Sequence, residues 1–450
     1  MNKKLLALAV ASVVAAPAAM AQTSNVQLYG RANLGIDNYR ATKARDQQAQ
    51  VGQTGFIFGT STTATATNAT NPNPGADCVA GSVCASGGAV DRKSRVRIFD
   101  SGSRVGLRGT EDLGNGLKAI FQIETGVNID NGSNTGQGGQ PNTSSGFWAS
   151  RDSFVGLDSN WGRVTFGRQS VYWANGVNAQ FGANYINNEI PWTNGTNLGR
   201  ISAQGPAPAR VSNMVQYTSP TFAGINGTLS YSPNAQEAVQ GEGVGSRANG
   251  YLWGATLRGT WGPWYAQIDY ADVNGNSPTS GAPRGEGEAW KIGGSWGYMP
   301  GARLGVIWVH SRTNNRLASQ AVTAFNGFRV GDRVSQSGWT INWEHTFGNF
   351  QAMAQYGWTN DIKGCDDPII SCSNSKSRGY MVGGRYLLSK RTWLYASWNY
   401  INNKENNYAD YTGGSITSTA PVPGAPNVGA GNVPWGANPQ IWAFGVFHQF

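Results

Sequence analysis

The sequence predicts an all-β fold, a closed barrel of antiparallel strands, and three observations support this prediction. Apolar and polar side chains alternate along most of the chain, and short turns alternate with long polar stretches. The 450 residues include 62 Gly, 17 Trp and 17 Tyr, only 13 % are charged, and the mean hydropathy is −0.38. A barrel in a membrane has this composition, because apolar residues are needed only at every second position.

The first segment has the features of a secretory signal peptide. Met1 to Lys4 is basic, Leu5 to Val14 is apolar, and Ala19-Met20-Ala21 fits a small-residue cleavage pattern. A transmembrane anchor is the alternative, but the apolar run is shorter than the roughly 20 residues that a spanning helix needs. We therefore expect residues 1–21 to be the signal peptide and residues 22–450 to form the barrel domain.

The first strand is predicted between Val26 and Asp37. Its even positions are largely apolar and its odd positions largely polar, and a strand turns successive side chains to opposite faces. The same period recurs over 339–345, 350–359 and 394–400. Such segments of about nine to thirteen residues are long enough to cross a bilayer core when tilted.

The connections sort into two classes. Seven short turns lie at Asp112–Gly116, Asp158–Gly162, Ser219–Gly224, Thr260–Pro263, Gly297–Ala302, Thr346–Asn349 and Leu388–Arg391. Eight long polar stretches lie at 39–94, 131–146, 170–209, 234–246, 274–285, 313–332, 361–377 and 403–434. Fifteen connections join sixteen strands, with both chain ends on the short-turn side. Short periplasmic turns and long outer loops are typical of outer-membrane barrels, whereas a soluble sandwich has no reason to sort its loops.

Aromatic residues gather near the expected strand ends. They are Tyr29, Trp148, Trp161, Trp261, Trp264, Trp296, Tyr298, Phe347, Trp393 and Trp442. As a set they are expected to form girdles at the bilayer interface, although core or turn positions in a soluble β protein are the alternative. The chain ends in another alternating segment, in which Trp442, Phe444 and Val446 share a face with Phe450. This segment is expected to close the barrel by pairing with Val26–Asp37.

Three motifs resemble those of general porins from β-proteobacteria: Val26–Gly30, Ser103–Ala119 and Phe166–Gln169. The C-terminal Phe450, with alternating residues before it, is similar to the outer-membrane barrel terminus that the assembly machinery reads. The resemblance covers the whole mature chain. It implies a sixteen-stranded, trimeric, water-filled channel in the outer membrane of a Gram-negative bacterium, in contact with lipid and lipopolysaccharide. Independently of the resemblance, the long stretch at about 170–209 is rich in aromatic residues and carries one acid, Glu189, so we expect it to fold into the lumen and narrow the pore. The first outer loop departs from the family in being long and rich in Thr, Ala, Asn and Gly (53–90).

The resemblance also implies a charged constriction. It places Arg104, Arg151 and Arg210 in a basic cluster, faced by the acidic residues Glu124 and Glu189. The alternation supports part of this independently of the family. Arg104 and Arg108 share a parity that is opposite to that of the apolar Val105 and Leu107, so both arginines are expected to point inward.

Two further points concern this cluster. Glu124 shares the inward parity with Gln122 and Lys118, but the face of Arg151 stays open, because Phe154 and Val155 after it are both apolar. Arg163, Arg168 and Arg200 are further, weaker candidates for the cluster. An excess of arginine in a narrow pore attracts anions, and arginine stays charged at physiological pH. The alternative is that these arginines only solvate the lumen or pair with nearby acids.

The four cysteines form two close pairs, Cys78 with Cys84 and Cys365 with Cys372, each within one long loop. Four cysteines allow three connectivities. An exported chain crosses an oxidising compartment, so two local loop disulfides are expected. A mixed zinc site is the alternative, but no histidine lies near either pair.

The same observations limit the function classes. The three histidines, His310, His345 and His448, lie on predicted strands without a nucleophile constellation, and no basic run with interleaved aromatics suggests nucleic-acid binding. We expect no enzyme and no cofactor. The sequence favours a general diffusion porin with weak anion selectivity for ions and small hydrophilic solutes. The alternatives are a substrate-specific channel for anions or organic acids, and a non-transporting adhesin or structural barrel.

Overall fold

The computed structural model describes residues 24–43, 91–127, 129–130, 148–171, 210–233, 251–274, 284–316, 333–364, 373–405, 407, 409 and 436–450. Several predicted features lie outside these ranges. They are the signal peptide, the first outer loop, nearly all of the constriction loop with Glu189, and all four cysteines. The disulfides and the domain boundaries therefore stay predictions.

The described part of the chain consists of antiparallel strands. They are β1 Ser24–Thr42, β2 Arg92–Asp100, β3 Arg104–Gly114, β4 Leu117–Gly126, β5 Ser153–Ser159, β6 Gly162–Ser170, β7 Arg210–Thr218, β8 Ile225–Ser232, β9 Tyr251–Trp261, β10 Trp264–Asn274, β11 Arg284–Met299, β12 Ala302–Arg316, β13 Arg333–Phe347, β14 Phe350–Thr359, β15 Ser377–Leu387, β16 Thr392–Asn403 and β17 Asn438–Gln449. Among the described residues, no helix is long and apolar enough to cross a membrane.

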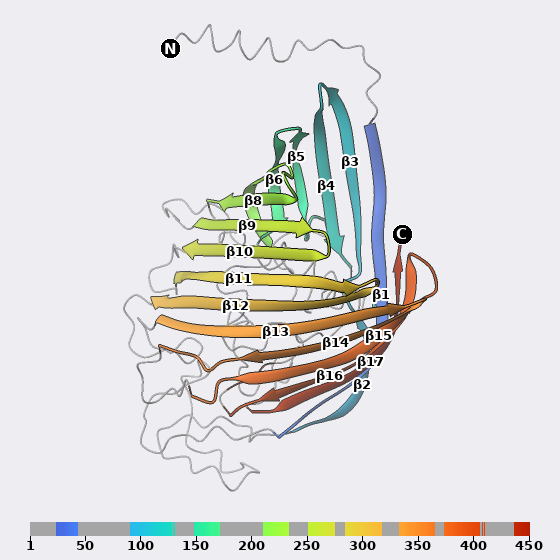
Figure 1. The fold of residues 1–450 in the computed structure, drawn as a ribbon, viewed down its shortest axis with the longest axis vertical. Coiled ribbons are helices and arrows are strands. Elements are labelled where there is room, and N and C mark those ends of the chain that lie inside the picture. Colours follow the sequence, from blue (N-terminus) through green and yellow to red (C-terminus); the bar gives the residue numbers. More distant parts are fainter. Residues whose placement is uncertain are drawn as a thin grey trace, which may run out of the picture.

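The sheet closes on itself. From β3 to β17 each strand pairs with the next, and Figure 1 shows β9 to β14 side by side in chain order while β1, β3 and β4 run across their direction. The last strand, β17, pairs with β1 from Arg31 opposite Gln449 to Thr42 opposite Asn438. Both β2 and β3 pair with β1, so they are two halves of one barrel strand. The barrel therefore has the predicted sixteen strands, and the predicted closing strand is confirmed.

The two ends of the barrel differ as the sequence predicts. All seven short turns connect strands at one end, which we name the turn end, and the strand ends that the long connections join are at the other, the loop end. The tightest turns use left-handed backbone at their centres, such as Asn115 with φ 53° and Gly262 with φ 55°. Asparagine and glycine tolerate this conformation better than other residues.

The two faces of the wall are inverted relative to a soluble protein. On β1, the apolar Val26 and Leu28 are 62 % and 60 % exposed on the outer face, while Asn33 and Asp37 are buried on the inner face. The same division holds around the barrel, where Thr340, Asn342 and Asn399 are buried. An apolar exterior and a polar interior are characteristic of barrels that span outer membranes.

Most of the predicted girdle aromatics are exposed, as side chains in contact with a membrane would be. Trp148, Trp161, Trp261, Trp264, Trp296, Phe347 and Trp442 are all more than 40 % exposed. The assignment is wrong for Tyr29 and Trp393. The hydroxyl of Tyr29 donates to the inner-face Glu124, and Trp393 is buried and stacks on Phe447 with ring centroids 3.9 Å apart. Parity along the strand, rather than nearness to its end, decides which face an aromatic side chain occupies.

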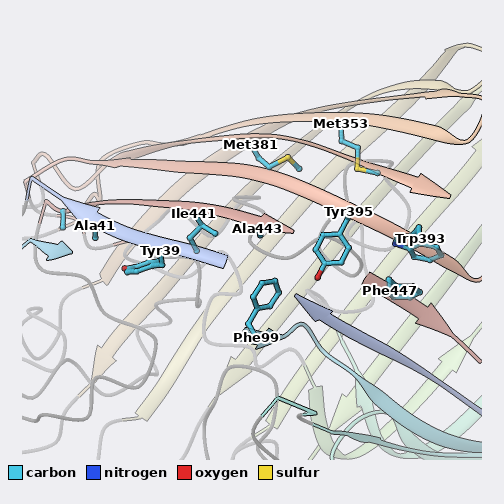
Figure 2. Close-up of a cluster of buried hydrophobic side chains, with 11 residues drawn as sticks. Tyr39, Ala41, Phe99, Met353, Met381, Trp393, Tyr395, Ile441, Ala443 and Phe447 are labelled. Atoms are coloured by element: carbon cyan, nitrogen blue, oxygen red, sulfur yellow. The ribbon is translucent and has the colours of Figure 1, made fainter. Parts of the chain in front are cut away.

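An apolar cluster covers the inner face where the first and last strands meet (Figure 2). It includes Tyr39, Phe99, Trp393, Tyr395 and Phe447. The Tyr395 ring crosses β17 above Gly445, and its hydroxyl donates to Asn33 Oδ1 on β1 over 2.8 Å. This contact links β16 directly to β1, and so it ties together the strands that close the barrel.

The second barrel strand is interrupted between β2 and β3. Arg31 pairs with Arg104 and Leu34 with Asp100, so residues 101–103 stand opposite only two residues of β1. The break is held by hydrogen bonds from Arg31 Nε to the Gly102 carbonyl and from the Asn33 amide to Ser103 Oγ, both 2.9 Å. This is a β-bulge, which shifts the parity of the strand. The sequence did not reveal it, because the alternation predicted a loop up to Ser94 and a strand near Ser103.

Candidate functional site

The site is centred on Glu124, an inner-face residue of β4 whose side chain is only 6 % exposed. Three donors from three other segments surround its carboxylate. Arg151 Nε contacts Oε1 at 2.5 Å, the Tyr29 hydroxyl donates to Oε2 over 3.1 Å, and Arg104 Nε lies 3.5 Å from Oε2. A nearly buried carboxylate needs such partners, because burial of an unpaired charge is costly.

Arg104 owes its place to the bulge that precedes it. On β2 the inner-face residues are odd-numbered, as shown by the ion pair of Arg97 with the inner-face Asp37 at 2.8 Å. After the bulge the even-numbered residues of β3 face inward, so Arg104 reaches Glu124. Its side chain is still 28 % exposed, against 9 % for Arg151, the other arginine in contact with Glu124.

Arg151 and Asp152 lie outside the strands, in an irregular segment before β5 in which Ala149 has a φ of 66°. Val155 and Leu157 of β5 are exposed on the outer face, so a regular extension of the strand would turn Arg151 outward as well. The bend instead brings its guanidinium to Glu124, with only 9 % of the side chain exposed. Burial and the nearby charge of Arg210 lower the pKa of Arg151 to about 10, which leaves it protonated at neutral pH.

Arg210, at the start of β7, pairs with Asp152. Its Nε lies 2.9 Å from Asp152 Oδ2, and the Ser170 amide donates to Oδ1 of the same carboxylate. Burial opposes ionisation of Asp152, but Arg210 and the Ser170 amide outweigh it and lower its pKa. Arg168 Nη1 donates to Ser212 Oγ over 2.9 Å beside this pair.

Arg108 lies four residues after Arg104, on the same face of β3. Its Nε and Nη2 donate to Gln27 Oε1 over 2.9 and 2.7 Å, and its guanidinium lies 5.0 Å from the centroid of the Tyr29 ring. It therefore stacks on the residue that also bonds Glu124.

The described charges of this site do not balance. Five arginines (Arg104, Arg108, Arg151, Arg168 and Arg210) stand against two carboxylates (Glu124 and Asp152), which leaves a net charge of +3. Within the described ranges, no group of three or more His, Cys, Asp or Glu residues could hold a metal ion. The arrangement can attract and orient anions, and it offers a cation less favourable surroundings.

Sequence reasoning missed two members of the site. Asp152 follows Arg151 directly, but irregular backbone gives no parity from which to assign it. Tyr29 lies between Gln27 and Arg31 on the polar face of β1, and this parity would have placed it inside had it not been counted with the girdle. The constriction role of the acidic partner Glu189 stays a prediction.

Comparison with known proteins agrees with this architecture. A family model described as Gram-negative porin matches residues 7–406. An outer membrane porin of Bordetella pertussis is 29 % identical over 331 residues, covering 69 % of this chain and 80 % of that protein. A major outer membrane protein P.IB of Neisseria gonorrhoeae is 28 % identical over 54 % of this chain and 51 % of its own length.

Solved structures share the fold. An anion-selective porin from Comamonas acidovorans superimposes with a TM-score of 0.60 at 21 % identity, over 95 % of this chain and all of that one. The trimer form of OmpT from Vibrio cholerae gives a TM-score of 0.54 at 11 % identity, over 95 % of this chain and 99 % of that one. Since the family model spans most of the sequence and the barrel is closed, the chain belongs to the Gram-negative porin family and is a diffusion porin of the outer membrane.

Proposed function

We propose that this porin is a general diffusion channel with weak anion selectivity, set by a constriction with Arg104, Arg108, Arg151 and Arg210 on its basic side and Glu124 and Glu189 as its acidic members. The observation that carries the proposal is the net charge of +3 on the described cluster, in which these four arginines and Arg168 stand against Glu124 and Asp152. Small hydrophilic solutes and ions pass down their gradients, and we infer that no reaction is catalysed.

The charges have different roles in this proposal. Arg151 is nearly buried and is neutralised by Glu124, and Arg210 is neutralised in part by Asp152. Of the two arginines in contact with Glu124, Arg104 has the longer contact and the greater exposure, so it presents its charge to solutes, as does the exposed Arg108. A positive group in a narrow aqueous pore lowers the energy of a passing anion and raises that of a cation.

The assembly is part of the same proposal. We infer a homotrimer in contact with outer-membrane lipid and lipopolysaccharide, delivered by its signal peptide and inserted by the barrel assembly machinery, which recognises Phe450. The apolar outer face supports this proposal. Phe450 exchanges two backbone hydrogen bonds of 3.1 Å with Gly30, so the terminus is part of the barrel seam.

Planar-bilayer recording tests the proposal. Stepwise insertion and a reversal potential of the anion sign in a KCl gradient are expected for the wild type. Arg104→Gln and Arg210→Gln should each move the reversal potential toward cation selectivity. Arg163→Gln is the matched control and should leave the reversal potential unchanged. Arg163 pairs with Asp158 at the turn end of β6, away from the cluster around Glu124.

The outcomes separate the alternatives. A reversal potential of the cation sign in the wild type would refute anion selectivity. Conductance that saturates with one organic acid would favour a substrate-specific channel. Correctly folded protein that never produces steps would refute the channel and favour an adhesin or structural barrel.

A further inference from the structure

We infer that Tyr29 is a positioning residue of the constriction: its hydroxyl holds the Glu124 carboxylate beside Arg151 and thereby leaves Arg104 to face solutes. This inference rests on the proposed function, because it concerns how the same cluster sets anion selectivity. It assigns a role to a residue that carries no charge at neutral pH.

Tyr29 reaches Glu124 by crossing a strand. It is paired with Gly106 of β3, and Glu124 lies opposite Gly106 on the far side, on β4. A Cβ atom at Gly106 would lie 2.6 Å from Tyr29 Cζ, so only glycine leaves room for the ring there. The Arg108 guanidinium lies 5.0 Å from the ring centroid. The ring is therefore fixed by the glycine beneath it and the cation beside it.

The carboxylate is shared unequally by its donors. Oε1 accepts from Arg151, whereas Oε2 lies 3.1 Å from the Tyr29 hydroxyl and 3.5 Å from Arg104 Nε. Charge-assisted contacts between arginine and carboxylate are usually about 2.7–2.9 Å long, so the Arg104 contact is loose. The hydroxyl occupies the closer place on Oε2, and Arg104 stays the more exposed of the two arginines, at 28 % against 9 %.

Loss of the hydroxyl should change this distribution without changing the net charge. Among the described residues, Oε2 would keep Arg104 as its nearest donor, and the loose contact would shorten. Arg104 would then be drawn toward the wall and its charge screened by Glu124. The positive potential that a passing anion meets would fall, and with it the anion selectivity.

The chain contains a matched comparison in Tyr395. Its ring also lies over a glycine of the neighbouring strand, where a Cβ at Gly445 would be 2.3 Å from the hydroxyl. Its hydroxyl also crosses that strand to an inner-face acceptor, at 2.8 Å, but the acceptor is the neutral amide oxygen of Asn33. Tyr395→Phe therefore removes the same group from the same geometry without touching a carboxylate.

The experiment compares Tyr29→Phe, Tyr395→Phe and wild type in planar bilayers under one KCl gradient. We expect Tyr29→Phe to lower the anion-to-cation permeability ratio by about twofold or more, because a hydrogen bond to a charged group is lost. Tyr395→Phe should leave the ratio unchanged. In a Glu124→Gln background, Tyr29→Phe should have no further effect, since the carboxylate on which it acts is gone.

Each outcome decides a point. An unchanged ratio for Tyr29→Phe in an anion-selective wild type overturns the inference and leaves the proposed function intact. Absent anion selectivity in the wild type overturns the proposed function itself. If Tyr29→Phe does not assemble into a heat-modifiable barrel while Tyr395→Phe does, Tyr29 is structural and the inference fails.

Discussion

Removal of the Glu124 carboxylate should make the pore more anion-selective. Glu124→Gln keeps the shape and an acceptor oxygen but leaves Arg104 and Arg151 without their shared counter-charge. The direction is opposite to that expected for loss of any arginine of the cluster, so the sign of the change is as informative as its size.

The size follows from Coulomb's law. An ion that passes about 6 Å from the carboxylate interacts with it by about 0.7 kcal/mol even at the dielectric constant of bulk water. Anion and cation are affected with opposite sign, which doubles the difference to about 1.4 kcal/mol, or about tenfold in the permeability ratio. Screening in 0.1 M salt, where the Debye length is about 10 Å, reduces this to about fourfold.

The assay is the reversal potential of the purified variant in a planar bilayer, at 0.1 M mean KCl. Because Arg151 is nearly buried, the variant should also lose stability, by about 3 kcal/mol or more, so its folded state must be verified by the heat-modifiable gel band. The double variant Glu124→Gln/Arg151→Gln loses one charge of each sign and should lie close to wild type in selectivity. A shift of Glu124→Gln toward cations, or none at all, would refute the electrostatic account.

Three further predictions concern the stability of the barrel wall and the dependence of ion selectivity on salt concentration. Gly445→Ala would place a Cβ 2.3 Å from the Tyr395 hydroxyl and should lower the unfolding free energy by about 1–3 kcal/mol, measured by urea titration in detergent. Gly227→Ala is the control: its Cβ would have no neighbour closer than 3.6 Å, so it should cost less. Asp269→Ala should cost about 3–5 kcal/mol in the same titration, because it leaves the fully buried Lys291 beside an apolar residue; a loss below 1 kcal/mol would contradict this. Raising KCl from 0.1 to 1 M should shrink the anion preference, as the Debye length falls from about 10 to 3 Å, and a salt-independent ratio would point to steric rather than electrostatic selection.

The regular part of this fold could be predicted because alternation carries the information directly. Val26 and Leu28 must face lipid, so Gln27 and Arg31 must face inward, and the same reasoning holds along β13, β14 and β17. The seven turns were predictable because two long alternating segments with a short polar connection have few other arrangements. Neither argument depends on contacts between distant segments.

The irregular part could not be predicted, because it does depend on contacts between distant segments and breaks the alternation. Residues 101–103 form a bulge whose hydrogen bonds to Arg31 and Asn33 come from a strand some seventy positions away. The bend before β5 turns Arg151 against the parity of Val155. A sequence reading assumes an unbroken period of two, so it has no means of locating either break.

These two irregularities lie on opposite sides of one carboxylate, and this explains why the site is where it is. The bulge aims Arg104 at Glu124 from β3, and the bend aims Arg151 at it from the segment before β5. Regular antiparallel strands fix the height of every residue in the wall, so charges on them are spaced by the pleat. Breaks in the ladder remove that limit locally, while the unbroken pairing elsewhere keeps the barrel closed. We therefore propose that selectivity in this porin can change through a few residues at the breaks, without altering the strands that assemble the channel.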